Sequence, residues 1–380
     1  MYTRSFWQMR LEDAWTRRSV LWLMGVRRAG KTFLCRSLSS TEYFDCELPR
    51  VRRRIEDSEA FLSSLEGKRV VLDEVHRLHD PAELLKIAAD HFPSVRILAT
   101  GASTLGASSR FRDTLAGRKE EIWLTPMTWE DTRDFGRPDL ERRLSHGGLP
   151  PFFLEDQPPE RDFQSWIDDY WATDILELFR LERRASFMRF FELLTAQSGG
   201  IFTANRFATP CEVSRTTIAN YLAVLEATFV MHVLRPFTRS RKQEIVSAPK
   251  VYAFDTGFVA AFRGWQVLRP EDRGLLWEHL VLNELHAQLQ SRRIHYWRTK
   301  HGNEIDFVLA PPGKPPIAIE CKSSVADFDP RNLGAFRRRY PRGRNLLVAS
   351  DARETYDRDF NGLAVTVTGL EDLAACLGKA

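Results

Sequence analysis

The eight residues Gly-Val-Arg-Arg-Ala-Gly-Lys-Thr at positions 25–32 constrain the fold more than any other stretch of the chain. They follow a short apolar run, 19–25, and precede a helix-like segment, 31–38. The two glycines let the backbone wrap so that its N–H groups face one point, and the helix start adds a positive dipole end. The stretch therefore predicts a phosphate-binding loop between a strand and a helix of an α/β fold.

The residues of this loop have expected roles in binding ATP. Lys31 is expected to reach the β- and γ-phosphates, and the Thr32 hydroxyl to bind Mg²⁺. Gly25, Arg28 and Gly30 complete the expected ATP-binding loop. Because the pattern also arises by chance, a second motif is needed to distinguish a nucleotide site from a coincidental match.

A second apolar run, 69–75, decides in favour of a nucleotide site because it ends in Asp73 and Glu74. Asp73 is expected to hold Mg²⁺, directly or through a water molecule. Glu74 is expected to polarise the water that attacks the γ-phosphate. With Lys31, these residues predict an enzyme that hydrolyses ATP to ADP and phosphate.

Apolar runs alternate with helix-like segments through the first third of the chain. Further strand-like runs occupy 42–46, 95–103 and 120–127, and 81–92 has helical spacing. Strands that are apolar on both faces and separated by helices predict a parallel sheet covered on both sides. The middle third favours helices, and the last third returns to mixed α/β patterns: a helix at 274–290 and 331–341, and strands at 294–298, 304–310, 316–321 and 344–350.

Composition narrows the class of protein without naming a function. A chain of 380 residues is long enough for two or three domains with their own cores. The five cysteines are scattered and form no Cys-x-x-Cys pair, which argues against a disulfide framework or a structural zinc site. No apolar run approaches the ~20 residues that span a bilayer. We therefore expect a cytoplasmic protein that has no membrane partner.

Ten segments together resemble a known family: GVRRAGKT, VVLDEVHRL, ILATGAS, LAGRKEEIWLTPMTWED, GGLPPF, TTIANYLAVLEATFV, KVYAFDTGF, WEHLVLNEL, YWRTKHGNEIDFVL and IECKSS, in that order. The chain resembles prokaryotic AAA-type (AAA+) ATPases with a C-terminal DUF4143 domain, from about residue 15 to about residue 350. The resemblance implies a parallel-sheet P-loop ATPase followed by a winged helix-turn-helix and a PD-(D/E)xK nuclease-like α/β domain. The boundaries that we expect for the ATPase core, a helical lid or connector, the winged helix and the nuclease-like domain are 1–135, 136–185, 186–250 and 251–380.

The resemblance also gives expected roles to residues after the acidic pair. Thr100 or Ser103 would lie between the acids and the γ-phosphate, although both residue types are also common in turns. Arg110, Arg112 or Arg118 would reach the γ-phosphate of a neighbouring subunit, and Arg118 is favoured because it directly precedes a strand. The alternative is that these arginines are solvated surface charges.

The segment 202–237 has the pattern of two short helices around a turn followed by a strand. Ser214 is a suitable N-cap for the second helix, whose core positions are Ile218, Tyr221, Leu222 and Leu225. The residues expected to contact DNA from this helix are Arg215, Thr216, Thr217 and Asn220. Those expected in the wing are Arg239, Arg241 and Lys242. The alternative is a protein-binding module or an ATPase lid. A further Arg-rich stretch, 336–344, either guides a nucleic-acid backbone or is a solvated face.

The C-terminal third carries an acidic cluster of the kind that a metal-dependent nuclease needs. Glu278 lies on an expected helix, Asp306 on a strand, and Glu320 and Lys322 two positions apart on the next strand, so that they share a face. Carboxylates around Mg²⁺ with a lysine that orients the attacking water are suited to phosphodiester cleavage. The alternative is an exposed Glu320–Lys322 ion pair, with Glu278 facing water.

Three functions remain open on the sequence. The first is an ATP-hydrolysing motor that forms a ring, expected to be a hexamer, and acts on DNA with ATP and Mg²⁺ as cofactors. The second is an ATP-regulated, metal-dependent DNA nuclease. The third is an ATP-driven switch that controls a protein partner. DNA stimulation of ATP hydrolysis distinguishes the first from the third.

Overall fold

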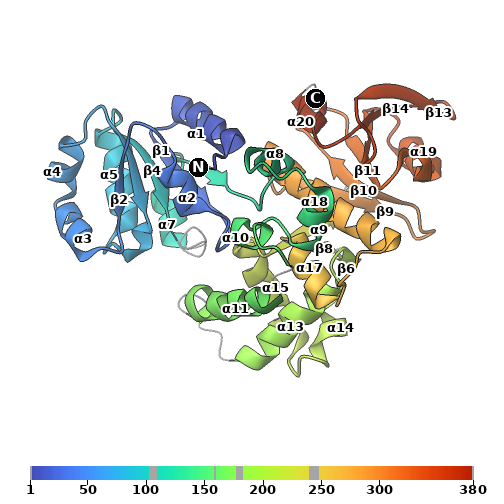
Figure 1. Cartoon of the computed structure of the whole chain (residues 1–380), viewed down its shortest axis with the longest axis horizontal. Coiled ribbons are helices and arrows are strands. Elements are labelled where there is room, and N and C mark those ends of the chain that lie inside the picture. Colours follow the sequence, from blue (N-terminus) through green and yellow to red (C-terminus); the bar gives the residue numbers. More distant parts are fainter. Residues whose placement is uncertain (1, 102–108, 158–159, 177–182, 239–247, 379–380) are drawn as a thin grey trace.

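Two sheets organise the chain, in a computed structural model that describes residues 2–101, 109–157, 160–176, 183–238 and 248–378. In Figure 1 the first sheet and its helices, blue to cyan, form one lobe, and the second sheet, yellow to red, lies in the other. Several green helices lie below the second sheet, and the long helix α18 (Pro270–Leu289) crosses the second lobe, with its C-terminal end on the side of the first lobe.

The first sheet is fully parallel and has the strand order β2-β3-β4-β1-β5 within the described residues. This confirms the expected parallel α/β fold of the first third. All residues of β1 are buried, as expected for a strand that is covered on both faces. The bounds are β1 Val20–Met24, β2 Thr41–Asp45, β3 Arg69–Asp73, β4 Arg96–Thr100 and β5 Lys119–Trp123.

Helices precede, connect and follow these strands. The helix at 81–92 expected from its spacing is present, capped by the Asp80 carboxylate, which accepts from the Glu83 N–H. The N-terminal helix has no counterpart among the expected elements. The bounds are α1 Ser5–Arg17, α2 Lys31–Arg36, α3 Pro49–Ile55, α4 Ser58–Ser63, η1 Val75–Arg77, α5 Pro81–His91 and α7 Ser109–Thr114.

The middle of the chain is largely helical, as its pattern predicts. One turn, η2, is a π-helix that continues α11 without a break. The bounds are α8 Trp129–Asp134, α9 Leu140–Ser145, α10 Pro150–Phe153, α11 Glu160–Tyr170, η2 Trp171–Ile175, α13 Arg184–Ala196, α14 Ala204–Ala208, α15 Arg215–Ala227 and α17 Thr256–Phe262.

The second sheet is mixed and, within the described residues, has the strand order β13-β14-β12-β11-β10-β9-β7-β8-β6. Strand β7 pairs in parallel with β9, so the strands of the middle segment continue into the C-terminal sheet. The expected boundary at 250/251 therefore falls inside β8, between its first two residues. The bounds are β6 Gly200–Ile201, β7 Met231–Pro236, β8 Lys250–Ala253, β9 Ile294–Arg298, β10 Glu304–Leu309, β11 Ile317–Lys322, β12 Asn345–Ala349, β13 Tyr356–Phe360 and β14 Leu363–Thr368.

The C-terminal helices are α18, η3 Val325–Asp327, α19 Arg331–Arg339 and α20 Leu373–Gly378. Helix α18 joins the two lobes by hydrogen bonds at several points along its length. Trp277 Nε1 donates to Val348 O of β12 at 3.0 Å. At the other end, Gln290 closes a pair of bonds with the backbone of Trp123 in β5, at 2.7 and 3.1 Å. The helix is therefore tied to both sheets.

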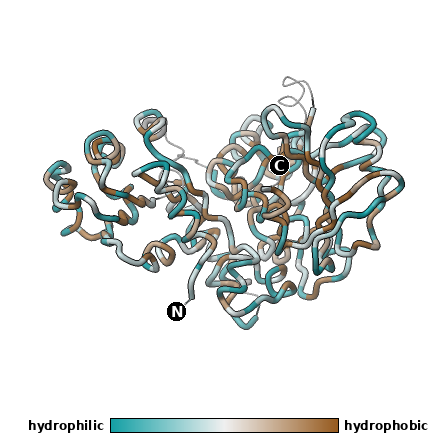
Figure 2. The backbone as a smooth tube through the Cα atoms, turned by 90° about the horizontal axis from the view of Figure 1, so that it is seen from above, coloured by the Kyte–Doolittle hydropathy of each residue, from teal (hydrophilic) through white to brown (hydrophobic). Residues whose placement is uncertain are grey.

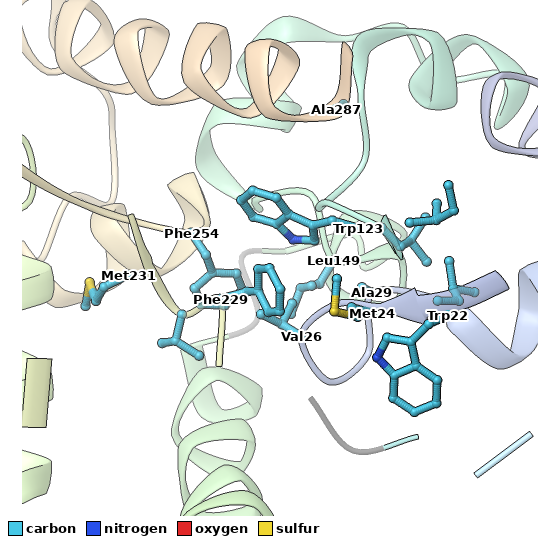
Figure 3. Packing of buried hydrophobic residues seen from close by; sticks show 14 of the residues in the cluster. Trp22, Met24, Val26, Ala29, Trp123, Leu149, Phe229, Met231, Phe254 and Ala287 are labelled. Carbon is cyan, nitrogen blue, oxygen red and sulfur yellow. The ribbon is translucent and has the colours of Figure 1, made fainter. Parts of the chain in front are cut away.

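The hydrophobic core runs from the first lobe into the second. One buried cluster contains residues of β1, β5, α15, β7 and α18. Figure 3 shows Trp123 close to Phe229, and the two ring centroids are 4.7 Å apart. Figure 2 shows brown, apolar tube segments inside both lobes and teal segments mainly at the periphery. Within the described ranges, we find no helix with the length and apolarity to cross a membrane.

Candidate functional site

Two glycines give the loop between β1 and α2 its shape. Gly25 has φ 151° and approaches the next strand so closely that a Cβ there would be 2.4 Å from Leu124 O. Gly30 has φ 94° and precedes α2 in the left-handed conformation. A side chain is strained at such positions. The backbone geometry thus accounts for the first and sixth positions of the motif.

Lys31 and Thr32 begin α2 and line a cavity of about 520 Å³ beside the carboxyl ends of β1 and β3. Lys31 Nζ donates to Gly25 O at 2.8 Å and to Val26 O at 3.1 Å, so the ammonium group is held within the loop. Burial lowers the pKa of Lys31, while the nearby Glu74 carboxylate acts in the opposite direction. The loop therefore presents a buried cationic group to the cavity.

The acidic pair lies at the end of β3, as its sequence predicts, and Thr100 links its two members. Asp73 is 3% exposed, and its carboxylate accepts from Thr100 Oγ1 and, at 2.5 Å, from Tyr43 OH. The Glu74 N–H donates to Thr100 Oγ1 at 3.1 Å. The Thr100 hydroxyl and the Tyr43 phenol fix the Asp73 carboxylate at the end of β3, next to Glu74, where its oxygens could serve a cation bound to phosphate.

Glu74 lies in the left-handed region, with φ 56°, and lines the cavity. Its Oε2 is 3.0 Å from His76 Nδ1. Burial acts to raise the pKa of Glu74, but the hydrogen bond from His76 and the charge of Lys31 outweigh it and lower that pKa. Glu74 is therefore ionised at neutral pH and faces the same cavity as Lys31.

The other wall of the cavity is apolar and aromatic. The rings of Tyr2 and Phe135 stack with centroids 4.5 Å apart and an interplanar angle of 6°. Both rings line the cavity together with Pro150, Pro151 and Leu154. A flat apolar wall beside a phosphate loop suits the base of a nucleotide. None of these residues was expected from the sequence, because they come from three separate segments.

The acidic cluster assembles on β10, β11 and α18. Lys322 Nζ is 3.2 Å from Glu320 Oε2 and 3.9 Å from Asp306 Oδ2, and the Cys321 N–H donates to Asp306 Oδ2 at 2.8 Å. Glu320 is 3% exposed, and burial, with the neighbouring Asp306, raises its pKa well above the usual range. The alternative of an exposed Glu320–Lys322 pair is therefore wrong.

Glu278 is engaged by a residue that the sequence had not singled out. Lys250 Nζ is 2.8 Å from Glu278 Oε1 and 2.7 Å from Glu304 Oε1, and Tyr252 OH also donates to Glu278 Oε1. The Glu278 side chain is 14% exposed and held in an ion pair, so the alternative that it faces water is wrong. Among the residues with described positions, no three or more acidic, His or Cys side chains form a ready metal cage.

One oxygen of the cluster distinguishes it from a closed ion-pair network. Glu320 Oε1 is buried and has no hydrogen-bond partner. A buried carboxylate oxygen without a partner is costly unless a ligand satisfies it. Asp306 and Glu320 therefore fit a divalent cation better than Glu278 does, because Glu278 is already bound by Lys250 and Tyr252.

Comparison with known families assigns most of the chain. An AAA domain model matches residues 17–132, a domain of unknown function (DUF8612) matches 137–269, and a domain of unknown function (DUF4143) matches 273–370. The uncharacterized protein Rv2008c of Mycobacterium tuberculosis is 30% identical over 318 residues, which cover 80% of this chain and 71% of the relative. The chain belongs to the AAA+ ATPase family with a C-terminal DUF4143 domain.

Two further proteins are similar to this chain. The uncharacterized protein Mb2031c of Mycobacterium bovis is likewise 30% identical over 318 residues and covers the same shares, 80% and 71%. A solved structure, the Walker-type ATPase PABY2304 of Pyrococcus abyssi, is 16% identical and covers 69% of this chain and 96% of that chain, with a TM-score of 0.44. The family assignment rests on the sequence matches.

The helical pair expected to contact DNA in this DUF4143-family ATPase forms where its pattern places it. Ser214 caps α15 by accepting from the Thr217 N–H at 3.1 Å. The four expected core positions of α15 are buried. Arg215, Thr216 and Asn220 are exposed, and Thr217 is half-buried. The expected wing residues Arg239, Arg241 and Lys242 lie outside the described residues.

The arginines of this AAA+ protein occupy varied positions. Arg118 directly precedes β5, at the amino end of the parallel strands and thus opposite the phosphate loop, and its Nε is 2.8 Å from Asp90 Oδ1. The side chains of Arg110 and Arg112, and the whole of Ser103, lie outside the described residues. In the stretch 336–344, Arg337 is buried and donates to backbone carbonyls, including Arg342 O at 2.7 Å, so for Arg337 both surface interpretations are wrong.

Proposed function

We propose that this AAA+ protein hydrolyses ATP, assembles into a ring and acts on DNA as a motor. The observation that supports hydrolysis is that Lys31 and Glu74 line one cavity, while Thr100 hydrogen-bonds both Glu74 and the adjacent buried Asp73. A phosphate-binding lysine, a fixed carboxylate for a cation and a second carboxylate for water are the parts that nucleotide hydrolysis needs.

Each of these residues has a role in the proposed reaction. Lys31 and the loop backbone bind the β- and γ-phosphates, and Thr32 and Asp73 hold Mg²⁺, which neutralises charge that develops on the phosphates. Glu74 orients and polarises the attacking water. The stacked pair Tyr2 and Phe135 provides a surface for the adenine base. Burial acts to raise the pKa of Glu74, and the hydrogen bond from His76 acts to lower it.

Assembly into a ring rests on Arg118. Its position opposite the phosphate loop makes it unable to serve its own cavity and leaves it available to the cavity of a neighbouring subunit. An arginine that stabilises the γ-phosphate in this way contributes about 10³–10⁵-fold to turnover. We expect Arg118→Ala to remove this contribution only under conditions in which the protein assembles, and Asp90→Asn to leave turnover nearly unchanged.

DNA binding is proposed for α15 and the residues that follow β7. The exposed residues Arg215, Thr216 and Asn220 lie in the first two turns of α15, where they are accessible to a phosphate backbone or to base edges. The decisive experiment is an ATPase assay with and without duplex, single-stranded and branched DNA, combined with mass measurement in the presence of ATP. Turnover that is independent of DNA and a protein that stays monomeric would refute the motor.

A second proposed function, metal-dependent DNA cleavage in a PD-(D/E)xK-like domain, is favoured by the unpartnered Glu320 Oε1. Asp306 and Glu320 would hold the cation, and Lys322, close to both, would orient the attacking water. Cleavage with Mg²⁺ or Mn²⁺ that survives both Asp306→Ala and Lys322→Ala would place the chemistry elsewhere. ATP turnover without measurable DNA affinity at low salt would instead support a switch that acts on a protein partner.

A further inference from the structure

The phosphate loop is in contact with a helix from outside the first sheet. Trp166 Nε1, in α11, donates to Arg27 O at 3.1 Å. Arg27 Nη1 donates to Thr173 Oγ1 at 2.6 Å and lies 3.5 Å from Asp174 Oδ2, both in the π-turn η2. Three bonds thus join one arginine of the loop to a segment that lies more than a hundred positions further along the chain.

The next arginine of the loop makes a parallel contact. Arg28 Nη2 donates to Asp169 Oδ2 at 3.2 Å. The two contacts differ in burial, because the Asp174 side chain is 5% exposed whereas that of Asp169 is 46% exposed. Charge interactions are strong only where water is excluded. The two arginines are similarly exposed, at 39% and 34%, so the pairs differ mainly in the burial of the acid, and Asp169 offers a matched surface control for Asp174.

Asp174 also faces the nucleotide cavity itself. Thr173 and Asp174 line the cavity of about 520 Å³ together with Lys31, Thr32 and Glu74. Burial lowers the pKa of Lys31, whereas the charges of Glu74 and Asp174 both act to raise it. Asp174 thus faces the same cavity as Lys31 and Glu74.

The π-turn explains how η2 presents these two side chains. Insertion of a residue into a helix shifts every following side chain around the axis, and such turns often accompany functional sites. Here the shift coincides with Thr173 and Asp174, which point at the loop, while the neighbouring Trp171 and Ile175 remain buried in the core. The local geometry is therefore specific to the contact with Arg27.

We propose that Asp174 makes the site discriminate between the triphosphate and the diphosphate. Asp174 binds Arg27 where the terminal phosphate would bind it, so the two compete for this arginine. The proposal rests on the proposed binding of ATP at this loop. A γ-phosphate brings negative charge next to the Asp174 carboxylate and offers Arg27 a stronger anionic partner. Arg27 then exchanges Asp174 for phosphate, and α11–η2 separates from the loop. A diphosphate leaves the contact in place.

Nucleotide affinities of variants test the discrimination. We expect Asp174→Asn to bind a non-hydrolysable ATP analogue about tenfold more tightly than the unmodified protein, and ADP by less than about threefold. Asp169→Asn, the exposed control, is expected to change both affinities by less than about threefold. Thr173→Val removes a bond to Arg27 without removing charge, so it is expected to give a smaller change than Asp174→Asn with the same preference for the triphosphate.

Hydrogen exchange of the unmodified chain provides a test that needs no variant. The amides of 160–175 are expected to exchange faster with the ATP analogue than with ADP, while those of the phosphate loop become protected. Slower exchange in 160–175 with the analogue, or equal effects of Asp174→Asn on both nucleotides, would overturn the proposal. If the unmodified protein bound neither nucleotide, the proposed function itself would fall as well.

Discussion

At the edge of the first sheet, Lys31 and the loop around it face a cavity, whereas at the second sheet Lys250 and Lys322 are already engaged by the carboxylates around them. Both regions combine lysine with a buried acid, Asp73 in the first and Glu320 in the second. In the first, the cationic side chains that line the cavity outnumber the acidic ones, which favours an anionic ligand. In the second, acids outnumber the lysines, and one oxygen of Glu320 is left without a partner.

This difference in charge balance indicates which kind of ligand each region is suited to bind. A cavity lined by a phosphate loop, an ionised Glu74 and an aromatic wall suits a large anion with a base. A cluster of acids and lysines with one unsatisfied carboxylate oxygen suits a small cation. Without a cation, the same cluster is a set of buried ion pairs in the core. Substitutions that affect ligand binding and core stability separately test this difference between the two regions.

The largest expected effect is that of Glu74→Gln on ATP hydrolysis. The amide keeps the size of the side chain but cannot take a proton from water, so turnover should fall by about 10²–10⁴-fold while ATP binding persists. Phosphate release and titration with a fluorescent ATP analogue measure the two quantities separately. Glu47→Gln, on an exposed side chain of the same cavity, is the control and should alter turnover only a few-fold.

The separation of the two regions would be contradicted if Glu320→Gln at the second sheet slowed ATP hydrolysis as much as Glu74→Gln does. Glu320 lies in a different sheet and has no contact with the nucleotide cavity among the contacts of the described residues. Equal losses would mean that the two regions act as one site. Unchanged turnover in Glu320→Gln is the expected result.

The next effect in size is on stability, from Lys250→Met. Lys250 is buried between Glu278 and Glu304, and removal of one partner of a buried ion pair costs about 3–5 kcal/mol, because the remaining charges stay desolvated. Chemical unfolding followed by tryptophan fluorescence measures the loss. In the double variant Lys250→Met/Glu278→Gln most of the loss should be recovered. A single variant as stable as the unmodified protein would show that the cluster is hydrated.

Much of the first lobe follows from its sequence, because its determinants are local. The apolar runs became β1 to β5, and the loop motif lies where strand and helix patterns meet. The edges of the second sheet and the residues that bind its acids were not predictable in the same way. The parallel pairing of β7 with β9 and the approach of Lys250 to Glu278 depend on contacts between distant segments, for which periodicity gives no signal.

The π-turn and the aromatic wall were missed for a related reason. A π-turn differs from an α-helix by one inserted residue, which leaves the apolar pattern of 160–175 nearly intact. Tyr2 precedes α1 and Phe135 follows α8, so neither belongs to a repeating pattern. One signal was available for Asp174, since an acid amid the apolar segment Trp-Ala-Thr-Asp-Ile needs a partner when buried.

The smallest expected effect concerns the junction between the lobes, where Glu284 of α18 accepts from the Trp129 N–H at 2.6 Å. Burial raises the pKa of Glu284 to about 8, although the bond from Trp129 acts against it. The folded chain thus binds this proton more tightly than the unfolded chain does. The stabilisation is complete below the unfolded pKa and is lost as the pH rises through about 8, with a slope of at most about 1.4 kcal/mol per pH unit.

Glu284→Gln removes this titration while it keeps an oxygen for the Trp129 N–H. The free energy of unfolding of the variant should therefore vary less between pH 6 and pH 9 than that of the unmodified chain, and the variant should be the more stable of the two at pH 9. Urea unfolding at a series of pH values measures both curves. Parallel curves would mean that Glu284 is ionised in the folded protein at neutral pH. The junction that ties the nucleotide lobe to the acidic cluster would then carry a buried charge, and the contrast between the two regions would extend to the helix that joins them.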